Sequence, residues 1–423
     1  METFSLTAPV YSKLAYPSPD TGLLVYPPYN EQHDRLPDFS YAGYNHGLND
    51  IPSDIPVAAF LQPNPDPSTD DTLRIQQLLD HISTLPLDPV TRLRGALQLS
   101  RGDFRVSGTI NIYSSGVVLQ GDPKGGTHVL VTVNPRQSTH LINLEGKPHE
   151  LVAGTRAVIA DDYVSVGSSQ VRVTRPDLFC PGDRVIVIVN FNEAWIQKIE
   201  MHNIPSKGNT SENMRWKPGR FESFRIVRAV DPVTGSITLD VPLTLSISKQ
   251  WGGGSVQKYT SRRLECVGVQ NLAFELPFNK DRTPDDIMRN EGPTGKKDYR
   301  FAGEMFKNYL IRMEDVEDGW VRRVTSKWFR NFLRVQSGVV STTIEDCHHL
   351  FPPPVKPPQR VPYFCGQSAY ELGGQLVLLN RCHADHSMHS YVYMARITGP
   401  NVIHACTASN RMADAGPHMK WCE

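Results

Sequence analysis

Short stretches of alternating hydrophobic and polar residues dominate the chain from position 96 onward. The segments 96–100, 104–112 and 116–121 place apolar residues at every second position, with Gly and Ser turns between them. A period of two is typical of β-strands that bury one face. Few helical segments separate these strands, which argues against a fold of alternating strands and helices. The pattern therefore predicts an all-β protein.

One helix is predicted ahead of these strands, over residues 71–80. Apolar residues at positions 75, 78 and 79 follow helical spacing, and Thr69 or Asp70 can accept hydrogen bonds from the first free N–H groups. The preceding residues 1–67 show no sustained period. We interpret them as an extended N-terminal arm, held on the body by aromatic residues such as Tyr26, Tyr41 and Tyr44.

Residues 151–250 have the character of an insertion. Strands are predicted at 164–173, 182–190 and 224–240, the last as a hairpin around the sequence ProValThrGlySer. Between them, residues 191–222 are polar and contain Trp195 and Trp216. We predict a small β subdomain with one long loop.

An internal repeat becomes visible after residue 267. Five short segments end in a small or aliphatic residue, and the last three steps of this column, from 324 to 347, 382 and 406, are 23, 35 and 24 residues long. Repeats of this length with strands in each unit are typical of a β-solenoid, in which equivalent positions stack on one another. The predicted inward column is Leu272, Val324, Cys347, Cys382 and Cys406.

This column sets the register of the outer surface. Residues directly before and after an inward position point outward, which gives Arg323, Asp346 and Arg381 on one side and His348 and His383 on the other. Neighbouring rungs are about 4.8 Å apart, so we expect an outer strip of arginine, aspartate and histidine. The cysteines themselves are interpreted as small apolar fillers of the interior.

The helix at 71–80 and the strands at 104–112 and 116–121 together resemble the entry of pectate-lyase-like single-stranded β-helix proteins. That superfamily includes polysaccharide lyases, glycoside hydrolases, carbohydrate epimerases and phage tailspikes, and the resemblance covers about residues 65–423. It implies a right-handed parallel β-helix with an inserted small β subdomain and one N-terminal capping helix. The expected parts are the arm 1–67, the β-helix entry with its helix 68–150, the inserted subdomain 151–250, and the rungs 251–423 that carry the site.

The end of the sequence departs from this pattern. The next rung would place its inward residue near position 430, whereas the sequence ends at Glu423. An uncapped last rung exposes strand edges. We therefore expect a protein contact at the C-terminal rung, a cover from another segment such as the N-terminal arm, or a natural chain that continues further.

The composition of the chain limits the classes of partner that it is expected to bind. The 44 basic and 44 acidic residues cancel, which gives no general field for nucleic acid, and no apolar run is long enough to cross a membrane. The N-terminus lacks the basic and apolar regions of a signal peptide. As written, the sequence predicts a cytoplasmic protein, or an extracellular one if the natural chain begins earlier.

Half of the 14 histidines lie between positions 348 and 418. A lyase acting on a uronate needs a cation beside the carboxylate and a base that removes the adjacent C5 proton. We therefore predict a catalytic group of His383, His386, Arg381 and Tyr391. The predicted substrate-binding residues are Arg323, Asp346, His348, His349, Asp385, His389, Tyr393, His418 and Lys420.

No cofactor is expected. The histidines at 383, 386 and 389 match no standard zinc spacing, but a divalent metal there, or calcium elsewhere, stays open. The leading functional hypothesis is a polysaccharide lyase that cleaves a uronate-containing glycan by β-elimination, with a polysaccharide or oligosaccharide as its partner. The alternatives are a glycoside hydrolase on the same surface, a non-catalytic glycan-binding solenoid, and an intracellular enzyme acting on a small molecule.

Overall fold

The computed structural model describes residues 11–132, 140–204, 215–276, 309–329, 331–350, 366–385, 387–409 and 419–421. The chain divides into two compact units. One consists of Tyr41–His149, Arg262–Ile397 and Asn401–Glu423, and the other of Met1–Ser40, Glu150–Ser261 and Thr398–Pro400.

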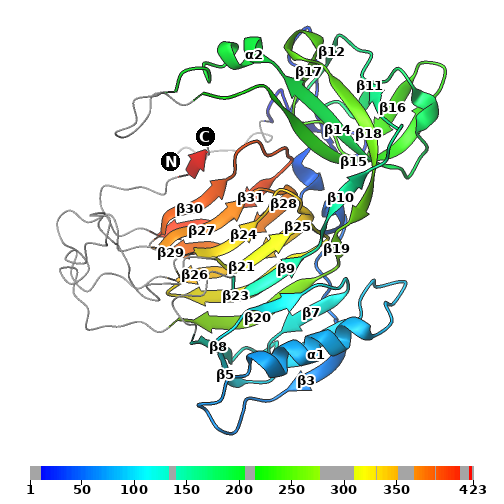
Figure 1. Cartoon of the computed structure of the whole chain (residues 1–423). Helices are drawn as coiled ribbons and strands as arrows, with labels where there is room; N and C mark the ends of the chain where they lie inside the picture. Colours follow the sequence, from blue (N-terminus) through cyan, green and yellow to red (C-terminus); the bar gives the residue numbers. More distant parts are fainter. Residues whose placement is uncertain are drawn as a thin grey trace, which may run out of the picture. The chain divides into compact units, whose positions relative to one another are not determined.

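The larger unit is a parallel β-helix, as the sequence predicts. Its strands form two sheets in which neighbouring strands pair in parallel across successive rungs (Figure 1). We call the sheet that changes direction within each rung the bent sheet, and the other the second sheet. The bent sheet contains β3 (Val57–Leu61), β4 (Gly95–Leu99), β5 (Gly102–Val106), β7 (Val117–Gln120), β8 (Thr127–Val131), β19 (Leu264–Glu265), β20 (Gly268–Glu275), β22 (Val316–Glu317), β23 (Trp320–Lys327), β25 (Val340–Glu345), β26 (His348–Leu350), β28 (Gln375–Asn380), β29 (His383–Asp385), β31 (Val402–His404) and β32 (Thr407–Ser409).

The second sheet supplies one strand to each rung. Its order is β33-β30-β27-β24-β21-β9-β6. Because every residue of a rung has an equivalent in the next, side chains of one kind line up in columns along the β-helix. The strands are β6 (Ile110–Ile112), β9 (Ile142–Glu145), β21 (Tyr309–Glu314), β24 (Asn331–Val335), β27 (Gly366–Leu372), β30 (Ser387–Tyr393) and β33 (Met419–Trp421).

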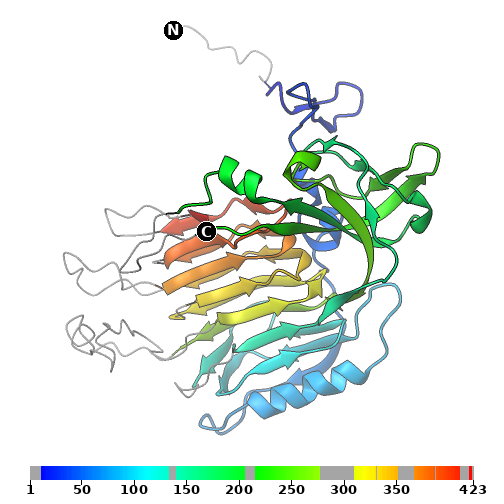
Figure 2. The ribbon, with the colours of Figure 1, turned by 45° about the horizontal axis from the view of Figure 1, so that its top comes forward.

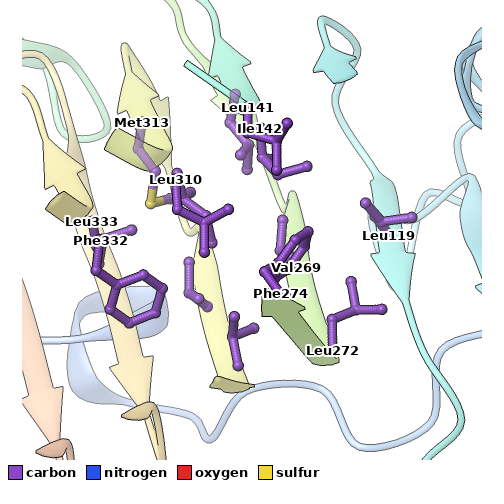
Figure 3. Close-up of a cluster of buried hydrophobic side chains, with 14 of the residues drawn as sticks. Leu119, Leu141, Ile142, Val269, Leu272, Phe274, Leu310, Met313, Phe332 and Leu333 are labelled. Carbon is purple, nitrogen blue, oxygen red and sulfur yellow. The ribbon is translucent and has the colours of Figure 1, made fainter. Parts of the chain in front are cut away.

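The interior between the sheets is filled by apolar side chains from every rung. Figure 3 shows one part of it, in which Leu272 and Phe274 of β20 lie near Leu310, Phe332 and their neighbours. The predicted inward column is confirmed, since Leu272, Val324, Cys347 and Cys382 are buried, while Cys406 of the last rung is partly exposed. Burial of this kind contributes roughly 25 cal/mol for each Å² of apolar surface.

The first rung carries the predicted helix, which is α1 (Thr72–Thr84). Ile75, Leu79 and Ile82 are buried, and Asp70 accepts a hydrogen bond from the N–H of Thr72 at 2.7 Å. This capping agrees with the sequence-based expectation. Figures 1 and 2 show α1 at the end of the β-helix that begins with β3.

Part of the predicted arm belongs to the β-helix itself. The strand β3 pairs in parallel with β4, and the segment before it contains the short 3-10 helix η2 (Tyr44–Gly47). The ring of Tyr44 packs edge-on against Trp320 with centroids 5.7 Å apart, and its N–H donates to Thr343 Oγ1 at 2.8 Å. This segment therefore covers part of the outer face of the bent sheet, as expected for Tyr44.

The smaller unit is built from antiparallel strands. The predicted hairpin is confirmed as β15 and β16, in which Asp231 pairs with Ser236. Its main sheet consists of β10 (Lys147–Leu151), β11 (Ala157–Val158), β13 (Gln170–Arg172), β14 (Arg184–Phe191), β15 (Gly219–Asp231), β16 (Ser236–Leu239) and β18 (Gly254–Arg262). Beside it lie the pairs β1 (Tyr16–Pro17) with β2 (Leu24–Val25) and β12 (Tyr163–Val164) with β17 (Ile247–Ser248), the helix α2 (Glu193–Lys198), and the 3-10 helices η1 (Phe39–Tyr41), η3 (Pro176–Leu178) and η4 (Lys249–Trp251). In the described ranges, neither α1 nor α2 is long and apolar enough to span a membrane.

Candidate functional site

The predicted strip lies at the bend of the bent sheet, which we call the corner. The residue before each inward position has a left-handed backbone, with φ between 49° and 59° in Asn271, Arg323, Asp346, Arg381 and Ala405. This conformation turns the chain from one strand segment to the next. For residues other than Gly and Asn it costs roughly 1–2 kcal/mol, so the repeat is held by the packing around it.

Arg381 forms ion pairs with two carboxylates at this corner. Its Nε and one Nη donate to the carboxylate of Asp346 at 2.7 and 3.0 Å, and the same Nη lies 2.7 Å from Glu345. The guanidinium lowers the pKa of Asp346, which therefore stays ionised. The structure brings the predicted Arg381 and Asp346 together, but two carboxylates already neutralise this arginine.

Arg323 stands one rung earlier in the same column. It is exposed, and it makes no hydrogen bond or ion pair with the residues that the structure describes. Its charge adds to that of Arg381 in lowering the pKa of Asp346. Arg323 is therefore the better of these two arginines to meet an incoming carboxylate.

The histidines on the other side of the corner follow one another in register. His348 pairs with His383, which pairs with Thr407, and the two imidazole centroids are 6.2 Å apart. His383 Nδ1 lies 2.8 Å from Thr407 Oγ1, and its Nε2 lies 3.4 Å from Ser409 Oγ. Since Ser409 gives its single proton to Asp385, it accepts from Nε2–H, and Nδ1 accepts from Thr407. Both nitrogens of His383 are thus engaged.

His348 differs from His383 because its imidazole is accessible to solvent and to a ligand. Its side chain is exposed and makes no hydrogen bond to any residue in the described part of the chain. Partial desolvation lowers its pKa, the neighbouring His383 lowers it further, and Asp346 opposes the shift. The ring is therefore neutral at neutral pH, with a lone pair free to take a proton.

Two predicted site residues lie inside the β-helix instead of on its surface, and a third is partly buried against its core. Tyr391 is buried and its hydroxyl lies 3.0 Å from the carbonyl of Cys382 and 2.7 Å from that of Thr407. His349 is fully buried, and Tyr393 packs against the same core. Expecting Tyr391 and His349 at an outer surface was wrong, because their positions alternate inward along the strands.

The remaining predicted residues are divided between the corner strip and the second sheet. Asp385 joins the corner strip, as described for Ser409. His389 lies in the second sheet, in register with Ser368. The backbone of Lys420 pairs with Val392 in that same sheet. His386 and His418 lie outside the described residues.

A second polar cluster lies on the second sheet and was missed by the sequence analysis. Arg312 of β21 and Arg334 of β24 are in register on neighbouring rungs, and Glu371 of β27 follows in the same column. Arg334 sits over the ring of Tyr309, with 5.4 Å from its Cζ to the centroid. The one feature of the sequence that could have revealed this cluster is the recurrence of charged residues at equivalent positions of successive rungs. The segments between these strands differ in length, so this recurrence has no regular spacing in the sequence.

His140 belongs to the same cluster. Its Nδ1 accepts a hydrogen bond from the N–H of Tyr309 at 3.2 Å. Desolvation, and then the charges of Arg312 and Arg334, lower its pKa to about 4. This imidazole is therefore neutral at physiological pH and lies in a positive local field.

Among the described residues, no three side chains of His, Cys, Asp or Glu converge in an arrangement that could hold a metal ion. The residue His386 of the sequence-based metal hypothesis lies outside this set.

Comparison with known proteins gives structural likeness only. No protein-family model matches the chain, and no curated protein matches it. One similar solved structure is the Gp54 tailspike of Acinetobacter baumannii bacteriophage AP22 in complex with A. baumannii capsular saccharide. This tailspike is 9% identical to the chain, and the match covers 81% of this chain and 56% of the tailspike, with a TM-score of 0.31. ORF18 of Geobacillus virus E2 is 11% identical over 84% of this chain and 43% of its own, with a TM-score of 0.39. An exopolygalacturonase from Thermotoga maritima is 10% identical over 82% and 55%, with a TM-score of 0.33.

The chain spans about half the length of these neighbours. The low identities and TM-scores mark a remote likeness, and the parallel β-helix is established by the strand pairing itself.

Proposed function

We propose that this protein is a carbohydrate-active enzyme that cleaves an acidic polysaccharide by β-elimination. The observation that carries the proposal is His348, an exposed and neutral imidazole without a hydrogen bond to the described residues, in the strip that also holds Arg323. A neutral base beside a cation is what proton removal next to a carboxylate requires.

The proposed roles follow from these contacts. Arg323 faces the uronate carboxylate and stabilises the negative charge that develops there. His348 removes the C5 proton, the bond between C4 and its glycosidic oxygen breaks, and a C4–C5 double bond forms. The leaving oxygen takes a proton from water, so the step balances without a redox partner. His383 positions the strip through its bonds to Thr407 and Ser409.

A glycoside hydrolase at the corner is less well supported. Hydrolysis needs one protonated carboxylic acid as the general acid. At the corner, Asp346 and Glu345 both lie against Arg381, and the pKa of Asp346 is lowered. Asp346 is therefore suited to remain charged and not to donate a proton.

The test is cleavage of a panel of uronate polymers. We expect an absorbance rise at about 235 nm from the unsaturated product, since elimination creates a conjugated double bond. His348→Gln should lower the rate by roughly 10²-fold or more, the usual share of a general base. His404→Gln is the matched control, because His404 is also exposed but bonds to Asn380 at 2.9 Å. Reducing ends without absorbance would show hydrolysis, and full activity in His348→Gln would refute the assignment.

A further inference from the structure

The column of Arg312, Arg334 and Glu371 differs from an ordinary ladder of ion pairs in one respect. Arg312 is saturated at both Nη groups. One donates to Asn143 at 3.2 Å and lies 3.7 Å from Glu145, and the other contacts Glu314. A saturated arginine on the outside of a sheet is explained by structure alone.

Arg334 is not saturated. Its Nε lies 3.5 Å from Glu371 Oε2 without hydrogen-bond geometry, and this Nε is buried. Its guanidinium makes no hydrogen bond to any residue of the described segments, although its side chain is only 30% exposed. A guanidinium carries five N–H donors in a rigid fork. At Arg334 the buried donor without a hydrogen bond is Nε–H, whereas the two Nη groups are open to solvent and to an acceptor from outside. The site therefore fits an anionic acceptor from outside the chain.

The neighbours of Arg334 hold it in place. The ring of Tyr309 lies beneath its Cζ at 5.4 Å, which is within the range of a cation–π contact. Burial of the ring, and then its hydrogen bond to Glu371, raise the pKa of Tyr309, so the phenol stays protonated as a donor. Glu371 is thereby tied to Tyr309 as well as lying close to Arg334.

Arg312 and Arg334 place two positive charges on neighbouring rungs of this cluster. Two arginines directly in register on parallel strands repel each other, and their charges depress the pKa of His140. An anion bound at Arg334 would relieve this repulsion. The three carboxylates nearby lie along the column, with Glu145 and Glu314 at Arg312 and Glu371 at Arg334.

We propose that the outer face of the second sheet, centred on Arg334 over Tyr309, binds the carboxylate or sulfate group of an acidic sugar. This site is separate from the corner and places a second acidic unit of the same polymer on the β-helix. The expected ligand class rests on the proposed function, but binding at Arg334 requires no cleavage. The bidentate fork of an arginine suits both anions.

The experiment measures binding of the full-length protein carrying His348→Gln, so that cleavage does not remove the ligand. Affinity electrophoresis in gels containing polygalacturonate, alginate, hyaluronan, chondroitin sulfate, dextran sulfate or neutral dextran gives the dissociation constants. We expect retention by one or more of the charged polymers and none by dextran. Retention by polygalacturonate, alginate or hyaluronan and not by dextran sulfate identifies the carboxylate as the recognised anion, and retention by dextran sulfate and not by these three identifies the sulfate. Chondroitin sulfate carries both groups and should be retained in either case.

Two substitutions with opposite expected signs make the test specific. Arg334→Gln should weaken binding about tenfold or more, the usual loss for a hydrogen bond to a charged group. Glu371→Gln keeps an acceptor for Tyr309 but removes the competing charge, and should tighten binding. Arg220→Gln is the control, because Arg220 pairs with Glu222 at 2.7 Å on the other unit.

Several outcomes overturn the proposal. It fails if the protein binds none of the charged polymers, or if Arg334→Gln and Arg220→Gln bind alike. It also fails if Glu371→Gln binds more weakly than the parent protein while its thermal unfolding is unchanged. Failure of the His348 experiment with retained effects at Arg334 would reject the cleavage mechanism and leave this binding site standing.

Discussion

Acid should destabilise this β-helix through one interior histidine, His349. The sequence analysis predicted that His349 binds substrate, but in the structure its side chain is completely buried. Its ring stacks on Phe332 with centroids 6.0 Å apart, and its Nδ1 lies 3.2 Å from Ser326 Oγ. Its Nε2 has no hydrogen-bond partner among the described residues. Desolvation lowers its pKa to about 3, with Asp385 opposing and His383 adding to the shift.

The size of the effect follows from proton linkage. An unfolded histidine has a pKa of about 6.5, so below that pH the unfolded chain binds a proton that the folded chain rejects. The contribution of neutral His349 is fully present above the unfolded pKa and is lost as the pH falls toward the folded value. Between pH 7 and pH 5 the free energy of unfolding should fall by about 2 kcal/mol from this residue alone.

Urea unfolding at pH 7 and pH 5 measures this loss. His349→Phe removes the titrating group, fills a similar volume and can still pack on Phe332, so it should lose about 2 kcal/mol less than the wild type over the same interval. Every other titrating group, including His140, is common to both proteins and cancels. Equal losses in the two proteins would refute the buried, neutral state of His349.

Two further predictions concern packing. Tyr391→Phe removes a hydroxyl that lies within hydrogen-bond distance of two carbonyl groups and shares its one proton between them. It should lower stability by about 1–2 kcal/mol in urea unfolding, whereas Tyr113→Phe at an exposed ring should change little. An unaltered Tyr391→Phe midpoint would contradict the interior placement. Gly268→Ala would bring a Cβ within 2.1 Å of the ring of Trp320 and should cost about 1–3 kcal/mol, so a variant as stable as the wild type would contradict this packing.

The sequence predicted the β-helix and the corner because one column of residues recurs there. Cys347 and Cys382 mark an inward position, and the positions next to them, such as Arg381 and His348, were correctly placed outside. The same alternation places His349 inside, two positions after Cys347, so the pattern itself argues against a surface role for it.

The second sheet could not be predicted in this way. The cysteine column sets the register of the bent sheet only, and the strands with Tyr391 and Arg334 are connected to it by segments of unequal length. Nothing in the spacing therefore fixed which side chains of those strands face outward. The two engaged nitrogens of His383, and the pairing of Arg381 with two carboxylates, depend on side-chain geometry that sequence spacing does not contain.

The central claim is that the protein breaks a glycosidic bond in an acidic polysaccharide by elimination and not by adding water. The most direct measurement is mass spectrometry of the products formed from a uronate polymer in water enriched in heavy oxygen. Elimination predicts fragments with an unsaturated end, each lighter than its hydrolysis counterpart by one water, and no heavy oxygen introduced by the cleavage. Saturated fragments that carry heavy oxygen from the cleavage step, or an intact polymer, would contradict it.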